Sequence, residues 1–124
     1  MPPTPEQEQV IREEQLAILA TLRREGSPQL TPVNYVYKDG RFLISTTRDR
    51  AKYHNVRRNP QVSLCILRPE GRPYVTVPGR ARIVEGTAEI FRRLTDRPPP
   101  ENFAEALRAQ GRVLIVVTPE RFLP

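Results

Sequence analysis

Residues 41–67 read RFLISTTRDRAKYHNVRRNPQVSLCIL, and this stretch decides how the rest of the chain is interpreted. Its ends, residues 41–46 and 61–67, are rich in branched side chains and predict two β-strands. The segment between them is polar and contains Asn59-Pro60, where a helix must end because proline disfavours helical geometry in the residue before it. A short helix between two strands is therefore expected.

The start of this helix is predicted from its capping residues. Thr47 and Asp49 both have side chains that can cap a helix N-terminus, and neither is preferred by the sequence alone. Arg50, Ala51 and Lys52 then fall in the first helical turn. The helix dipole is positive at this end and so favours a bound anion there.

These residue types indicate an anion site. The first-turn N–H groups lack helical partners, so a phosphate would meet them together with the donors Ser45, Thr46, Arg50 and Lys52. A solvated helix face with no ligand explains the same arginines equally well.

A longer stretch around this segment resembles a known family. Residues 30–47, LTPVNYVYKDGRFLISTT, followed by Arg50-Ala51-Lys52 and residues 55–62, NVRRNPQV, are similar to the flavin and deazaflavin split-barrel proteins. These form the pyridoxamine-phosphate-oxidase-like superfamily, and the resemblance is greatest to its coenzyme F420-dependent branch. It covers Leu16 to Leu123 and implies a split β-barrel, built as a homodimer with two cofactor sites at the subunit interface.

The length and composition fit one soluble domain, residues 1–124, with residues 1–5 as a loose tail because three of them are proline. No apolar run is long enough to span a membrane, and Met1 to Gln15 is too polar and acidic for a signal peptide. Cys65 is the only cysteine, so a disulfide framework is excluded. We expect a cytoplasmic protein.

The positive charge of the chain is concentrated in its middle. Between Lys38 and Arg82 there are 11 basic and 3 acidic residues, whereas the remainder holds 9 basic and 11 acidic residues. This concentration favours a polyanionic partner, either a phosphorylated small molecule or a nucleic acid. Nucleic acid is the weaker interpretation, because no zinc pattern, recognition-helix pair or aromatic RNA-binding motif accompanies the cations.

Alternating apolar residues and turn signals predict further strands. Asp39-Gly40 is a two-residue hairpin turn, and Pro32 must lie at a sheet edge or bulge because it cannot donate to a ladder. The run from Leu16 suits either a helix or a buried strand, and the resemblance favours a strand. The further strands expected are Leu16–Leu22, Gln29–Lys38, Tyr74–Glu85 with a bulge near Pro78-Gly79, and Arg112–Thr118.

Helices are expected from Glu6, over Thr87–Leu94, and over Glu101–Gln110, where Gly111 closes the last of them. The predicted fold class is therefore mainly β with short helices. Six to seven mostly antiparallel strands form the small barrel that the resemblance also implies.

The sequence lacks the usual signatures of hydrolytic and metal catalysis. His54 is the only histidine and is expected at the surface, Cys65 fits a core position, and neither a nucleophile elbow nor a zinc pattern is present. No metal site and no catalytic residue is predicted. A redox enzyme remains possible without them, because a bound cofactor carries the electron chemistry.

The resemblance assigns cofactor contacts residue by residue. Pro32, Val33 and Asn34 would line the ring, Ser45, Thr46, Arg50 and Lys52 would hold the phosphate, and Asn55 would hydrogen-bond nearby. Tyr74 would reach the site from the other subunit. The predicted cofactor-binding residues are Pro32, Val33, Asn34, Ser45, Thr46, Arg50, Lys52, Asn55 and Tyr74.

The resemblance favours coenzyme F420 over FMN. Both have a tricyclic ring and a phosphate, and the acidic tail of F420 could also use Arg48, Arg57 or Arg58. The expected function is hydride transfer to a small electron-poor acceptor that the sequence does not identify. An FMN-dependent oxidase-like flavoprotein is the alternative, and a module that only binds flavin, haem or nucleic acid is a second one.

Overall fold

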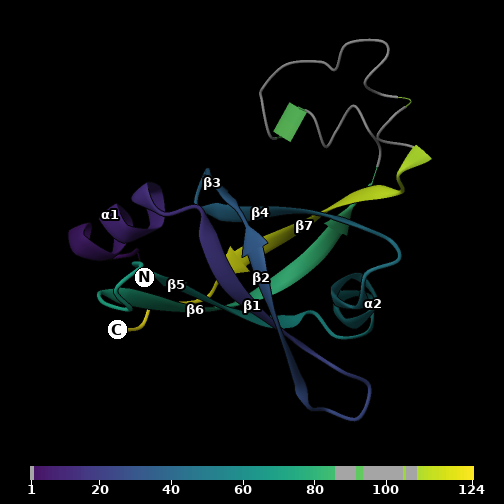
Figure 1. Ribbon diagram of the computed structural model, residues 1–124, viewed down its shortest axis with the longest axis horizontal. Coiled ribbons are helices and arrows are strands. Elements are labelled where there is room, and N and C mark those ends of the chain that lie inside the picture. Colours follow the sequence, from purple (N-terminus) through teal and green to yellow (C-terminus); the bar gives the residue numbers. More distant parts are fainter. Residues whose placement is uncertain (1, 86–91, 94–104, 106–108) are drawn as a thin grey trace.

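The computed structural model describes residues 2–85, 92–93, 105 and 109–124 (Figure 1). The helices expected over Thr87–Leu94 and Glu101–Gln110 therefore lie largely outside the described residues. The elements in chain order are α1 (Pro5–Glu13), β1 (Leu16–Leu22), β2 (Pro28–Asn34), β3 (Val36–Lys38), β4 (Arg41–Thr47), α2 (Ala51–Arg58), β5 (Gln61–Leu67), β6 (Tyr74–Val84) and β7 (Arg112–Pro119).

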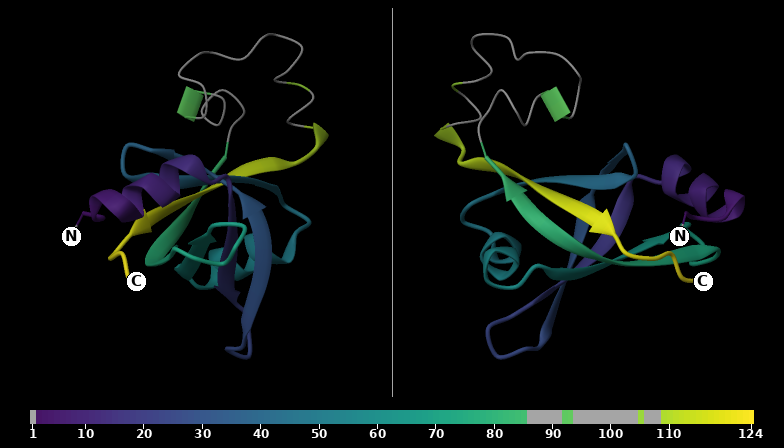
Figure 2. Two further views of the ribbon diagram at one scale, coloured as in Figure 1. Left: turned by 60° about the vertical axis from the view of Figure 1, so that its left-hand side comes forward. Right: turned by 180° about the vertical axis from the view of Figure 1, so that it is seen from behind.

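All seven strands belong to one sheet, in the order β2-β1-β5-β6-β7-β4-β3, with antiparallel neighbours throughout. β2 and β3 lie at opposite ends of this order, yet only Tyr35 separates them in the chain. The sheet must therefore curl until its two edges meet at Tyr35, which gives the split barrel seen in Figures 1 and 2. This confirms the predicted fold class.

The single strand expected over Gln29–Lys38 is wrong, because the chain changes partner at Tyr35. Residues 28–34 pair with β1, whereas residues 36–38 pair with β4. The aromatic ring of Tyr35 is buried and packs against Phe42 at a centroid distance of 5.5 Å. Packing of this side chain at the barrel end thus fixes the point at which the strand breaks.

The inner face of the curled sheet holds the main core, and the helices close its ends. α1 contributes Val10 and Ile11 to this core, and α2 contributes Val56. A second, smaller cluster lies on the outer face of β4, β7 and β6, where Leu43 and Val116 are buried. β7 is consequently buried on both faces, which explains its continuous apolar run.

The N-terminal helix begins earlier than expected. Thr4 is its N-cap, and a capping box with Gln7 joins them by hydrogen bonds of 2.8 and 3.2 Å. Pro5 occupies the first helical turn, where its missing N–H costs nothing. Pro5 is therefore the first residue of α1 and Thr4 is its N-cap, so the loose tail expected over residues 1–5 does not include these two residues.

The bulge expected near Pro78-Gly79 is absent. β6 pairs without interruption with β5 from Tyr74 to Arg80 and with β7 from Gly79 to Val84. Gly79 is needed for another reason, since a Cβ atom there would lie 2.6 Å from the carbonyl oxygen of Thr118. The glycine allows β7 to approach β6 closely, so it marks a close backbone contact rather than a break.

Replacing Gly79 with alanine is expected to destabilise the fold by about 1–3 kcal/mol, because the new methyl group must displace backbone in a packed sheet. The loss should appear as a lower midpoint in chemical denaturation. Pro78→Ala is the control at the neighbouring position. An unchanged midpoint for Gly79→Ala would contradict the close contact.

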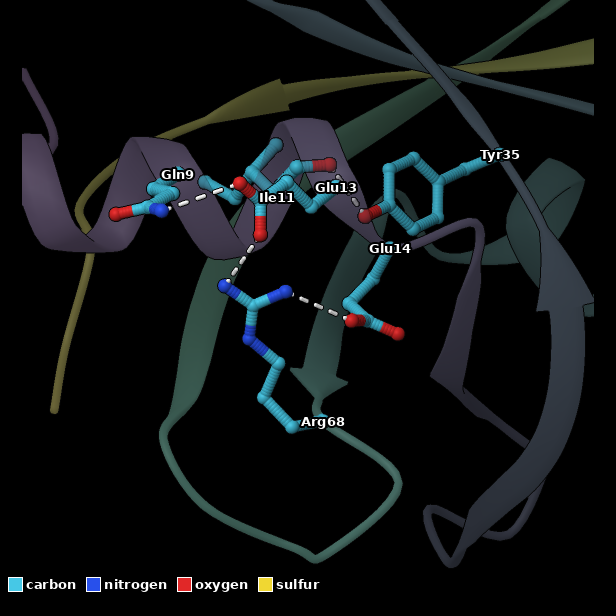
Figure 3. A network of polar contacts seen from close by, with 6 residues as sticks. All are labelled: Gln9, Ile11, Glu13, Glu14, Tyr35 and Arg68. Carbon is cyan, nitrogen blue, oxygen red and sulfur yellow. Dashed lines mark hydrogen bonds and ion pairs between the residues drawn. The ribbon is translucent and has the colours of Figure 1, made fainter.

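Arg68 at the end of β5 ties α1 to the barrel (Figure 3). Its guanidinium lies 2.8 Å from the carboxylate of Glu13 and 2.9 Å from that of Glu14. Nearby, the Tyr35 hydroxyl donates a 2.6 Å hydrogen bond to the carbonyl of Ile11. Burial raises the pKa of this hydroxyl, so it remains protonated and keeps its role as a donor.

The stability that Glu13 contributes should depend on pH. Hydrogen bonds from Gln9 and Arg68 lower the pKa of its carboxyl below the ordinary value of 4.5. A lowered folded-state pKa means that the stabilisation is present above pH 4.5 and is lost as the pH falls through the folded-state value. We expect Glu13→Gln to be less stable than the wild type at neutral pH.

The difference in denaturation midpoint between wild type and Glu13→Gln should shrink as the pH falls below 4.5. Glu70→Gln, in the exposed β5–β6 turn, is the matched control. A difference that stays constant with pH would contradict the ionised contact.

Candidate functional site

The barrel is split beside α2, where two strand edges have no partner. β3 pairs only with Arg41–Leu43 of β4, whereas β7 pairs with Phe42–Thr47 on the other side. One edge of β4 beyond Leu43 therefore lacks a strand neighbour within the described part of the chain. β2 is likewise an edge strand, because it pairs only with β1, and this position accommodates Pro32 as predicted.

The hydroxyl residues at the end of β4 face opposite ways. Ser45 is exposed on the outer face, whereas Thr46 is buried with 4% of its surface exposed. Successive side chains of a strand alternate between faces, so one ligand cannot meet both hydroxyls from the same side. A phosphate on the outer face would meet the Ser45 side chain and could reach Thr46 only through its backbone.

α2 begins without the side-chain cap that was expected. Arg50 is the N-cap and makes no capping hydrogen bond, while the Thr47 hydroxyl donates to the Asp49 carboxylate instead. The first turn of α2 contains no acidic residue. The prediction of a Thr47 or Asp49 cap is therefore wrong, and the first N–H groups of α2 receive no side-chain acceptor from the expected residues.

Arg50 and Lys52 lie close enough to repel each other. Partial burial is the main cause that lowers the pKa of Lys52, and the positive charge of Arg50 lowers it further, while Asp49 acts in the opposite direction. Among the described residues, neither cation forms an ion pair with a carboxylate. Two neighbouring cations that repel each other are stabilised by a bound anion.

Most of the additional cations proposed for an acidic tail already have partners. Arg48 forms a 2.8 Å ion pair with Glu85, and Arg58 donates a 2.8 Å hydrogen bond to Asn55. Arg57 lies over the ring of Tyr53 with its guanidinium 5.5 Å from the centroid. Arg57 is thus the cation of this set whose hydrogen-bond donors are least engaged.

Arg112 is a candidate site residue that sequence reasoning missed. It opens β7 directly opposite Thr47, and its guanidinium lies 3.5 Å from the Ser45 hydroxyl. Gln110 accepts a 3.1 Å hydrogen bond from its Nε atom and so orients the side chain. Only the pairing of β4 with β7 brings Arg112 here, and no local sequence signal reports that pairing.

Asn55 is buried and engaged within the chain. Its amide nitrogen donates 3.0 Å hydrogen bonds to Thr21 and to Gln29, and its oxygen accepts one from Arg58. Both N–H groups are used, so only the oxygen retains capacity for a further contact. Asn55 holds α2 against the β1–β2 hairpin.

The residues that were expected to line the cofactor ring lie on β2. Pro32 and Asn34 are exposed on the outer face, whereas Val33 points into the core. Tyr74 begins β6 and is 43% exposed on the outer face of the sheet, three strands away from β2 in the sheet order. Within one chain, Tyr74 therefore lies apart from the β2 residues that were expected beside the ring.

Comparison with known proteins agrees with this geometry. Residues 3–123 match the family model of pyridoxamine 5′-phosphate oxidase. The chain belongs to this oxidase family. A solved F420 reductase is 27% identical to it, with a TM-score of 0.75 over 98% of both chains.

Two other similar structures belong to proteins with different names. The haem storage protein HutZ from Vibrio cholerae is 19% identical, with a TM-score of 0.74 over 99% of this chain and 94% of its own. General stress protein 26 from Bacillus anthracis is 20% identical, with a TM-score of 0.70 over 94% of this chain and 93% of its own. These two likenesses concern the fold alone.

The described part of this oxidase-family chain groups no three metal-ligating side chains in reach of one ion. His54 is exposed on α2, as expected, and its ring packs edge-on against Tyr53. Cys65 is half-buried on the outer side of β5 rather than in the core, so that prediction is wrong. Within the described residues, no helix is both long and apolar enough to cross a bilayer.

Proposed function

We propose that this protein is an oxidoreductase that binds coenzyme F420 between two copies of the chain. The observation that carries the proposal is the pair of neighbouring cations, Arg50 and Lys52, which have no carboxylate partner among the described residues. They lie beside an uncapped helix start and the unpaired edge of β4. Backbone donors and fixed cations together fit the phosphate of a flavin-type cofactor.

Two observations favour F420 over FMN. The F420 reductase is 27% identical over nearly the whole length of both chains. The tail of F420 carries additional carboxylates, which suit further cations near the phosphate site, and Arg112 and Arg57 have no carboxylate partner in the described part of the chain. FMN has no such tail and remains the second candidate, since the chain matches the family model of pyridoxamine 5′-phosphate oxidase rather than that of an F420 enzyme.

A second copy of the chain would cover an apolar surface. Leu16, Leu30, Leu67 and Tyr74 project from the outer face of β1, β2, β5 and β6, and each is at least 36% exposed. We call these four side chains the outer apolar face. An exposed surface of this kind favours association. Pairing through it would bring Tyr74 of one copy towards the β2 residues of the other.

When bound, F420 would supply hydride transfer to an electron-poor acceptor. The chain itself would bind and orient the cofactor: Arg50, Lys52 and Ser45 would hold its phosphate, and Pro32 and Asn34 would lie beside its ring. The partner copy would exclude water from the ring by covering it with Tyr74.

Parallel equilibrium titrations with F420, FMN and haem test this proposal. F420 and FMN are followed by their fluorescence and haem by its absorbance, at two salt concentrations. We expect F420 to bind most tightly, with an affinity that falls at high salt because charge-assisted contacts are screened. Tight binding of FMN alone would support the second candidate, and binding of haem alone would reject a redox enzyme of this type.

A further inference from the structure

A cavity of about 680 Å³ lies at the end of the barrel away from α2. It is open to solvent on one side and is bounded by the first turns of α1, the start of β6 and the C-terminal residues, which lie close together in Figures 1 and 2. Its volume is in the range of small-molecule sites. The apolar lining residues include Val10, Pro73, Tyr74, Val75, Phe122 and Leu123.

The apolar lining is arranged as a floor and a rim. Val10 and Val75 are almost fully buried and form the floor, whereas Tyr74 and Leu123 are 43% and 36% exposed. Two large apolar side chains thus remain in contact with solvent inside a concave surface. Water in such a site forms few hydrogen bonds with its walls, so an apolar ligand displaces it favourably.

The walls are held in place before any ligand binds. The backbones of Thr76 and Leu123 exchange two hydrogen bonds of 3.0 and 2.8 Å, which fix the C-terminal segment against β6. On the opposite side, the capping box of Thr4 and Gln7 fixes the start of α1. A preformed site costs a ligand little ordering free energy.

The charged side chains at the rim of the cavity indicate the sign of the charge on the ligand. Glu6 and Arg121 both line the cavity, and neither forms an ion pair among the described residues. The charge of Glu6 is already stabilised, because it lies in the first turn of α1 at the positive end of the helix dipole. Arg121 has no such compensation, so the cavity favours a negative group beside it.

We propose that this cavity binds a small, mainly apolar molecule that carries one acidic group. The apolar body lies against Tyr74, Phe122 and Leu123, and the acidic group lies beside the Arg121 guanidinium. Binding at this cavity does not depend on the proposed function.

A matched pair of probes tests the charge and the apolar body separately. The probe 8-anilinonaphthalene-1-sulfonate has one sulfonate, and N-phenyl-1-naphthylamine has the same aromatic body without it. Both fluoresce on entering an apolar site. Arg121→Gln should weaken the sulfonate probe about threefold to tenfold, because one charge-assisted contact is lost, and leave the neutral probe unchanged.

Two further variants complete the test. Glu6→Gln should strengthen binding of the sulfonate probe, because it removes the negative charge at the rim, and Leu123→Ala should weaken both probes, because it removes apolar wall. Arg24→Gln, on the distant β1–β2 turn, is the control and should change neither. Equal effects of Arg121→Gln on both probes, or no effect on either, would overturn the proposal.

The same proteins titrated with F420 and FMN separate this inference from the proposed function. Arg121→Gln should leave the affinity for either cofactor unchanged, and saturating cofactor should leave the sulfonate probe bound. If the wild type binds neither cofactor but still shows the charge-dependent probe binding, the redox function fails and the cavity site stands. Displacement of the probe by cofactor would overturn the separate site.

Discussion

The variant in which both Arg50 and Lys52 are replaced by alanine is expected to lose cofactor binding almost completely while remaining folded. A hydrogen bond to a charged group is worth about 1.5–3 kcal/mol, so two such contacts amount to about 3–6 kcal/mol. This corresponds to a dissociation constant roughly two to four orders of magnitude higher. Fluorescence titration with F420 and FMN measures the change.

The fold of the double variant should be intact, and slightly more stable, because removing two neighbouring cations relieves their mutual repulsion. Arg23→Ala/Arg24→Ala is the charge-matched control, since it removes the same charge from the β1–β2 turn. That control should retain cofactor affinity. Equal loss in both double variants would mean that net charge, and not the Arg50–Lys52 site, attracts the ligand.

The phosphate site that we propose could be inferred from the sequence because its residues are neighbours along the chain. Ser45, Arg50 and Lys52 lie within one strand-to-helix connection, and their spacing alone places them together. The sequence does not report which way each side chain points or which group it hydrogen-bonds. The Thr47 hydroxyl bonds to Asp49 rather than capping α2, and two competing local hydrogen bonds of this kind look the same in a sequence.

The strands were predictable for the same local reason, but their partners were not. β1, β4, β5 and β7 follow from apolar patterns within single segments. Residues 28–38 form two strands instead of one because Tyr35 between them is buried. Glycine is required at position 79 because the backbone of Thr118 approaches it closely. Arg112 joins the site only because β7 pairs with β4. Each of these depends on contacts between segments far apart in the chain.

Asn55 shows how a residue implied by resemblance can have a different principal role. It was assigned a hydrogen bond to the cofactor, yet its side chain connects α2 to Thr21 of β1 and Gln29 of β2. Thr21 is buried with 1% of its surface exposed. If Asn55 is replaced, water therefore cannot readily take the place of the amide group that donates to the Thr21 hydroxyl. The same replacement removes the Asn55 oxygen that accepts a hydrogen bond from Arg58.

Asn55→Ala is therefore expected to destabilise the protein by about 3 kcal/mol, because removing one partner leaves buried polar groups unsatisfied at about 1–3 kcal/mol each. Chemical denaturation measures this loss. Asn59→Ala, at the end of α2, is the matched control and should cost less, since within the described residues its side chain accepts a single, solvent-exposed hydrogen bond from Gln61.

Cofactor affinity separates the two roles of Asn55. If Asn55 acts by positioning α2, the affinity of Asn55→Ala for F420, measured well below the unfolding transition, should fall modestly. Asn55→Asp should recover part of that affinity, because it retains the hydrogen bond from Arg58. If it contacts the cofactor directly, affinity should fall by at least tenfold with little loss of stability. The buried hydrogen bonds to Thr21 and Gln29 favour the first outcome, because a side chain whose N–H groups are both engaged has no donor left for a ligand.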